Sequence, residues 1–198
     1  MIRSVFLLAI VLLSLSAKAQ KKWPEMELQS VRQLKENKSQ IDLSGIGLYQ
    51  GALYLISDKA QHAAIYKAEM RDEGFYLVDK LPLRPESIRD LESASLDLEA
   101  ICNCGDTWYL ANESDNQIYS FNQKEGFRLV PTDLKAFGES RENWLTNAGI
   151  EGIAIDCAVG WLYLAKERQP RAIYKLSLAT GKVHIKAQIP ETESNDIS

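Results

Sequence analysis

Five acidic residues occupy corresponding places in three similar segments of this 198-residue chain. Each stands near the start or the end of a short apolar run. Carboxylates from several such places could bind a metal ion or activate a water molecule. The five are Asp58, Glu99, Glu113, Glu151 and Glu167. They can act together only if the elements that carry them bring them together in the fold.

One sequence pattern occurs three times, with Ser44, Glu99 and Glu151 at matching positions and steps of 55 and 52 residues. Each copy has a short strand pattern, a turn that contains glycine, a continuous apolar strand and a strand with an Ile-Tyr pair. A period near 50 residues built from short strands is typical of β-propeller blades. The sequence therefore predicts an all-β fold with three four-stranded antiparallel blades, at residues 41–82, 96–134 and 148–190.

The expected strands follow from this pattern. Continuous apolar second strands predict burial on both faces, as when blades stack. The first strands are expected at 43–49, 98–104 and 152–157, the second at 52–56, 107–111 and 161–165, and the fourth at 74–80, 127–134 and 182–189. The repeated tyrosine and tryptophan positions favour core packing over a ligand cage.

A fourth copy of the pattern begins at Asn195 and stops at Ser198. We therefore expect further blades in the complete protein, because a propeller covers its sheet flanks by closing a ring. The complete protein is expected to be a monomer. A naturally short form would need to pair its open flanks, as in a closed dimer.

The five acidic residues should gather at one end of the blades. In an antiparallel hairpin, the start of one strand and the end of the next lie at the same end. This predicts Glu99 beside Glu113 and Glu151 beside Glu167, with Asp58 at the matching place in the first blade. Because the first strand of a blade is innermost, the carboxylates should form an acidic rim at the channel mouth, suited to Ca²⁺. The alternative is structural, since acidic residues at strand ends also accept backbone hydrogen bonds in turns.

Other side chains limit the chemistry of this rim. The chain has no Gly-x-Ser-x-Gly or His-Glu-x-x-His motif, and its two histidines are expected on third and fourth strands, away from the rim. Hydrolysis would therefore need a metal-activated water and a rim carboxylate as base. Three basic residues near the rim could hold an anionic group: Lys59, Lys166 and Arg168. The alternative for Lys166 and Arg168, which flank Glu167, is that they offset the nearby carboxylates.

Residues 1–19 have the composition of a signal peptide, with Arg3, an apolar run and an Ala17-Lys18-Ala19 cleavage signal. The alternative is an uncleaved membrane anchor, for which the apolar run is short. We expect a periplasmic or secreted protein without membrane insertion after cleavage, and residues 20–40 could add an outer strand. Without the leader, 21 basic residues face 27 acidic ones, which disfavours nucleic-acid binding.

The three cysteines are Cys102, Cys104 and Cys157. In an oxidising compartment, a Cys104–Cys157 or a Cys102–Cys157 bridge would leave one free thiol. Small buried thiols are the equal alternative.

These motifs resemble the SdiA-regulated family of exported bacterial proteins, over about residues 40–198. That family has an Asp-Leu-Glu-Gly-Ile repeat and a later Asn-x-Gly-Phe-Glu-Gly-Leu-Ala followed by Lys-Glu-Lys-x-Pro. The second appears here as residues 147–154, with Ile150 for the phenylalanine, followed by residues 166–170. Ala100 replaces a family glycine, and Ser44 stands where the other copies have glutamate. The resemblance implies a six-bladed propeller related to β-propeller phytases and the esterase-like phytase group, with calcium near the axis.

Two functions of different classes remain open on this basis. One is an exported calcium-binding module for a small-molecule or protein ligand. The other is a calcium-dependent phytase-like or esterase-like hydrolase. A phosphate-ester hydrolase needs basic side chains at the rim, and only the three named above qualify, which favours the binding module.

Overall fold

The computed structural model describes residues 41–72, 74–83, 96–133, 149–168 and 171–189. The predicted leader and N-terminal segment (1–40), most of both connections between copies, and the start of the fourth copy lie outside these residues. Within the described ranges, no helix has the length and apolar character needed to cross a membrane.

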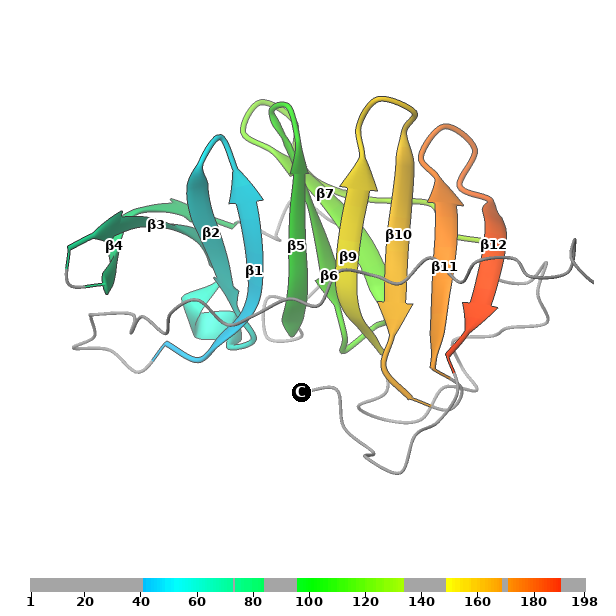
Figure 1. The fold of residues 1–198 in the computed structure, drawn as a ribbon, viewed down its shortest axis with the longest axis horizontal. Coiled ribbons are helices and arrows are strands. Elements are labelled where there is room, and N and C mark those ends of the chain that lie inside the picture. The colour runs from blue at the N-terminus through cyan, green and yellow to red at the C-terminus, as the bar shows by residue number, and fades with distance from the viewer. Residues whose placement is uncertain (1–40, 73, 84–95, 134–148, 169–170, 190–198) are drawn as a thin grey trace, which may run out of the picture. The chain divides into compact units, whose positions relative to one another are not determined.

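The described residues form three four-stranded sheets, each with its strands in sequence order and all neighbours antiparallel (Figure 1). This confirms the predicted all-β fold and its three four-stranded antiparallel sheets. The first sheet contains β1 (Leu43–Tyr49), β2 (Ala52–Ser57), β3 (Ala64–Arg71) and β4 (Gly74–Pro82), with a 3-10 turn η1 (Ala60–His62) between β2 and β3. The second contains β5 (Leu98–Cys104), β6 (Thr107–Asn112), β7 (Gln117–Asn122) and β8 (Gly126–Leu129). The third contains β9 (Ile150–Asp156), β10 (Trp161–Lys166), β11 (Ala172–Ser177) and β12 (Val183–Gln188).

Some details of the predicted strands were wrong. The fourth strand of the second sheet ends at Leu129 and does not reach residue 134, because Pro131 has no N–H to donate to a ladder. His62 is not on the third strand. It lies in η1, at the end of the first sheet where β2 ends. His184 lies on β12, as expected.

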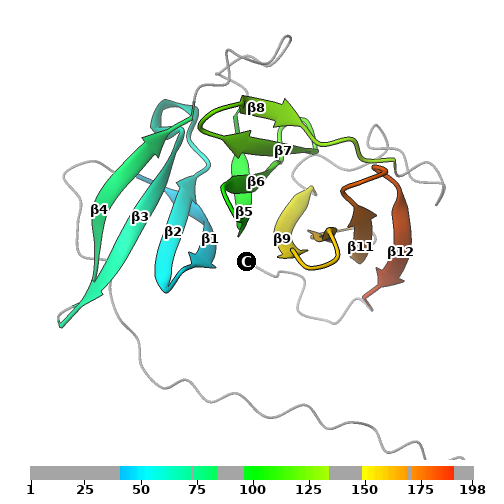
Figure 2. The same ribbon diagram turned by 90° about the horizontal axis from the view of Figure 1, so that it is seen from above.

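Neighbouring sheets pack face to face through two apolar cores. The first core joins the first and second sheets through residues such as Ile56, Leu98 and Leu110, all fully buried. The second core joins the second and third sheets around Ile118 and Leu164. In Figure 2 the first strands β1, β5 and β9 face inward and the fourth strands lie outside.

The second strands are not equally buried on both faces. The side chains of Leu162 and Leu164 are buried in the second core, whereas Trp161, Tyr163 and Ala165 are only half-buried. The expected burial on both faces therefore fails for β10, because only one of its faces packs in this core.

Close contact between first strands depends on a glycine. A Cβ on Gly47 would lie 3.1 Å from the carbonyl oxygen of Ile101 in β5, closer than most side chains tolerate. Gly47 therefore lets β1 approach β5 without a shift of either backbone.

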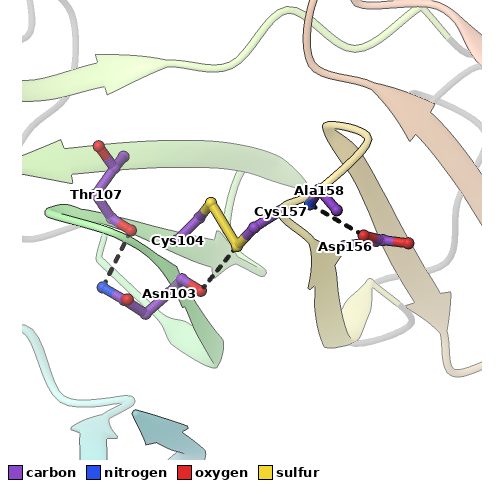
Figure 3. The surroundings of a disulfide bond; sticks show 6 residues. All are labelled: Asn103, Cys104, Thr107, Asp156, Cys157 and Ala158. Carbon is purple, nitrogen blue, oxygen red and sulfur yellow. Dashed lines mark hydrogen bonds between the residues drawn. A yellow bond between two sulfur atoms is a disulfide. The ribbon is translucent and has the colours of Figure 1, made fainter. Parts of the chain in front are cut away.

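A disulfide between Cys104 and Cys157 links the second and third sheets (Figure 3). Cys104 ends β5 and Cys157 directly follows β9, with their Cα atoms 5.7 Å apart. Cys102 is the free thiol of the described residues, and burial raises its pKa to about 12. The bridge lies at the end of β5 and β9 opposite their first residues.

Candidate functional site

Each first strand contains a β-bulge at the same place. In β5 the cross-strand pairing moves from Leu98 to Ala100, which leaves Glu99 without a residue directly opposite. The same irregularity occurs at Ser44 in β1 and at Glu151 in β9. A bulge turns its extra residue out of the regular alternation of a strand. The three matching positions of the repeat are therefore the three residues whose direction the bulges change.

Backbone hydrogen bonds hold the acidic residue after each of two second strands against the start of the first strand. The N–H of Glu113 donates to the carbonyl of Asp97, at 2.8 Å. The N–H of Glu167 donates to the carbonyl of Gly149, at 3.1 Å. These bonds fix both ends of the hairpin at the same end of the sheet, as the antiparallel pairing predicted.

The carboxylates form two clusters, and each spans two neighbouring sheets. We call Asp58, Asp97 and Glu99 the first cluster, and Glu113, Glu151 and Glu167 the second cluster. One carboxylate oxygen from each member lies within 4.8 Å of those of the other two. The bulged glutamate of one sheet thus meets the acidic residue that follows the second strand of the preceding sheet.

This grouping differs in part from the predicted one. Glu151 and Glu167 share a cluster, as expected from their hairpin. Glu99 and Glu113 fall in different clusters, because the bulge directs Glu99 toward Asp58 of the preceding sheet. The two clusters remain close enough for the charge of Glu113 to raise the pKa of Glu99.

Asp97 is a cluster member that the sequence prediction missed. The signal was present, because Asp42 and Asp97 occupy the same place before their first strands. Asp42 is exposed, with its carboxylate 3.8 Å from the ammonium of Lys59, and belongs to neither cluster. The third copy has Gly149 at this place.

Gly149 leaves the room that the second cluster needs. A Cβ at this position would lie 2.3 Å from Oδ1 of Asn116 and 2.7 Å from Cγ of Glu113. The N–H of Gly149 also donates to Oε1 of Glu113, at 3.3 Å. Gly149 therefore allows Glu113 to approach its partners in the third sheet.

Crowding makes these carboxyl groups hard to ionise together. Burial, and then the charges of Asp97, Glu113 and Asp58, raise the pKa of Glu99 to about 7. Burial, and then the charges of Glu113 and Glu99, raise the pKa of Glu151 to about 8. The pKa of Asp97 is raised for the same reasons, burial first. A positive ion between the carboxylates would offset their mutual repulsion and lower their pKa values.

Two buried acceptor oxygens at the clusters have no hydrogen-bond donor among the described residues. One is Oδ1 of Asp58, in the first cluster. The other is Oδ1 of Asn116, next to the Glu113 side chain of the second cluster. Buried acceptors are almost always satisfied in native proteins, and a cation at each cluster would supply a partner for these two oxygens. Ca²⁺ takes oxygen ligands at about 2.3–2.6 Å, which places its ligands about 5 Å apart or closer. The spacing within both clusters fits this requirement.

A buried polar residue stands directly before each acidic residue that follows a second strand. These residues are Ser57, Asn112 and Lys166, with at most 3% of each exposed. Asn112 accepts from the N–H of Asp97 at 2.7 Å and donates to Ser114 and Asp115. Such bonds fix the turns that carry the carboxylates, and of the three positions only Lys166 was among the predicted site residues.

The three basic residues near the rim are engaged with protein groups. The Lys59 ammonium binds Asp58, which raises the pKa of Lys59. Nε of Arg168 lies 2.6 Å from Oε1 of Glu167. Lys166 was named as a residue that could bind an anionic group, but its side chain is buried and donates to the carbonyl of Arg168. The buried position at the end of β10 explains this difference.

Residues 41–193 match the family model described as "Phytase-like: Esterase-like activity of phytase". The chain therefore belongs to this phytase-like family. A search of curated proteins found no match.

Several solved structures are similar at low sequence identity. Glutaminyl cyclase from Myxococcus xanthus is 14% identical with a TM-score of 0.48, and the match covers 75% of this chain and 53% of that one. For virginiamycin B lyase from Staphylococcus aureus the identity is 14%, the TM-score 0.47 and the coverage 80% and 45%. For a nidogen/laminin complex the identity is 13% and the TM-score 0.47, and the match covers 74% of this chain and 47% of that one. The matched region thus spans about half of each of these proteins, and these similarities carry no functional inference.

Proposed function

We propose that this member of the phytase-like family is an exported calcium-binding β-propeller of the SdiA-regulated type, which acts as a binding module through its acidic rim. The observation that carries the proposal is the pair of carboxylate clusters, each built across two neighbouring sheets. The unsatisfied Oδ1 of Asp58 inside the first cluster supports a cation there.

The two clusters would hold Ca²⁺ in similar ways. Asp58, Asp97 and Glu99 would supply carboxylate oxygens in the first cluster, and Glu113, Glu151 and Glu167 in the second. Because Ca²⁺ accepts six to eight oxygens, positions would remain for water or for an anionic group of a ligand. The clusters also join the sheets at the end opposite the disulfide, so bound ions would strengthen contacts between blades.

A second candidate is a calcium-dependent phytase-like or esterase-like hydrolase. The description of the matched family, which names an esterase-like activity, favours it. When bound, the metal would supply a polarised water molecule as nucleophile. The binding module stands first because Lys59 and Arg168 are paired with acidic side chains and Lys166 is buried, which leaves none of these three as a ready phosphate ligand.

The proposal extends to the whole protein. We place the described sheets in a six-bladed ring, monomeric when complete, that is exported to the periplasm or secreted through a cleaved leader. Its net negative charge supports a role that involves neither nucleic acid nor membrane insertion after cleavage.

Thermal unfolding of the metal-stripped chain with and without Ca²⁺ tests the proposal. Ca²⁺ should raise Tm, because an ion that binds only the folded state stabilises it. The Glu99→Gln, Glu151→Gln double variant should lose the rise, and Glu69→Gln, an exposed control paired with Lys67, should keep it. An equal rise in the double variant would contradict the proposal. Calcium-dependent cleavage of p-nitrophenyl phosphate or acetate, lost in the double variant, would instead establish the hydrolase.

A further inference from the structure

A cavity of about 580 Å³ lies between the first and second sheets, away from the two clusters. Its lining includes Gly105 and Asp106, in the turn between β5 and β6, and Lys124, in the turn between β7 and β8. Because the clusters lie where β5 begins and β6 ends, this turn is at the opposite end of the sheet. The volume falls within the range of small-molecule sites.

Three aromatic rings form one wall of this cavity. Tyr49 and Tyr54 come from the first sheet, and Trp108 comes from β6 of the second. The ring centroids of Tyr54 and Trp108 are 4.5 Å apart, and those of Tyr49 and Trp108 are 5.8 Å apart. Both tyrosines are only half-buried, so they remain accessible, whereas Trp108 is buried. The packed rings form a rigid apolar platform.

The cavity lining also carries charges of both signs. Asp79 and Lys80 come from β4, and Asp106 and Lys124 come from the two turns. All four are exposed. Lys67 also lines the cavity, but its ammonium is 3.0 Å from Glu69, so its charge is already compensated. The carboxylates accept hydrogen bonds and the ammonium groups donate them, and their charges cancel.

Side-chain amides add further polar groups to the lining, from Asn103, Asn122 and Gln123. Asn103 lines the cavity, and its Nδ2 donates to the carbonyl of Thr107 at 3.2 Å. Its Oδ1 is buried and has no hydrogen-bond donor among the described residues.

We propose that this cavity binds a carbohydrate. A sugar ring offers an apolar C–H face to the tyrosines and hydroxyl groups that both donate and accept hydrogen bonds. Donors and acceptors of opposite charge therefore suit hydroxyls better than they suit a phosphate or a simple hydrocarbon. Because the lining shares no residue with the two clusters, sugar binding needs no calcium and can fail or succeed separately from the proposed function.

Saturation-transfer NMR of the full chain in EDTA tests this site. The probes are the disaccharides maltose, cellobiose and N,N′-diacetylchitobiose, and AMP represents the alternative of a phosphate-bearing ligand. At least one disaccharide should bind with its ring protons saturated by the protein. Tyr54→Ala should weaken that binding by about tenfold or more, as expected when a stacking platform is removed.

Two further variants guard against a folding artefact. Asp106→Asn lies in an exposed hairpin turn and should leave the circular dichroism unchanged while weakening sugar binding severalfold. Tyr163→Ala, on β10 and outside the cavity, should bind as the unmodified chain does. Three results would overturn the proposal: no binding of any disaccharide at millimolar concentration, binding of AMP alone, or unchanged affinity in both Tyr54→Ala and Asp106→Asn.

Discussion

Glu113 and Glu151 belong to different sheets, yet their carboxylate oxygens lie within 4.8 Å of each other. Glu113 follows β6, and Glu151 is the bulged residue of β9. Asp58 and Glu99 repeat the relationship one sheet earlier. A contact between carboxylates costs free energy at neutral pH unless a proton or a cation is shared. Its recurrence at two sheet interfaces therefore points to a common need for a cation.

The first prediction concerns pH. The folded-state pKa of Glu99 is raised from 4.5 to about 7, and that of Glu151 from 4.5 to about 8. Between pH 4.5 and about 8 the folded state holds more protons than the unfolded state. The free energy of unfolding should therefore fall as pH rises through this window. Urea unfolding in EDTA across the window measures the fall. The slope should flatten with Ca²⁺, which competes with protons, and a metal-free stability that rises with pH would contradict the assignment.

The second prediction concerns Gly149→Ala. The added Cβ would meet Oδ1 of Asn116 at 2.3 Å and Cγ of Glu113 at 2.7 Å, so Glu113 must move. Overpacking of this kind costs about 1–3 kcal/mol. Calcium affinity at the second cluster should fall, while affinity at the first cluster should stay unchanged. An equal loss at both clusters would indicate general unfolding and not local displacement of Glu113.

The third prediction concerns Asn112→Ala. This fully buried side chain accepts from the N–H of Asp97 and donates to Ser114 and Asp115, so truncation leaves several polar groups unsatisfied. We expect a loss of about 2–4 kcal/mol in chemical denaturation. Asn122→Ala is the matched control, because the hydrogen bonds of its side-chain amide, to the backbone of Asp106 and Lys124, are exposed. Equal losses in the two variants would show that burial of the network is unimportant.

The fourth prediction concerns the Cys104–Cys157 disulfide. It closes a segment with a sequence separation of 53 residues. The chain-entropy model assigns a loop of this size about 4 kcal/mol of stabilisation. Cys104→Ser with Cys157→Ser should lower the free energy of unfolding by about this amount, and Cys102→Ala provides the thiol control. Thiol titration of the unfolded, unreduced chain should find only Cys102 reactive, and three reactive thiols would contradict the bridge.

The repeat made the sheets and the end that carries the carboxylates predictable from sequence. The hairpin positions of Glu151 and Glu167 followed from the antiparallel pairing alone. The grouping across sheets did not follow, because a bulge has no clear sequence signal and it directs Glu99 toward Asp58.

The buried polar positions were also invisible to sequence reasoning. Lys166 reads as an exposed basic residue beside an acidic one, yet it ends β10 with 3% of its surface exposed. Burial at a strand end depends on how neighbouring sheets pack, and a local sequence pattern does not indicate that packing. Asp97 could have been found, because Asp42 repeats its place in the first copy.

Isothermal titration calorimetry of the metal-stripped chain with Ca²⁺ measures directly whether the two carboxylate clusters bind calcium. The prediction is one binding event for each cluster, with Glu99→Gln removing the event at the first and Glu151→Gln the event at the second. Glu69→Gln should keep both. No binding heat from the unmodified chain, or unchanged calcium binding in the Glu99→Gln, Glu151→Gln double variant, would contradict it.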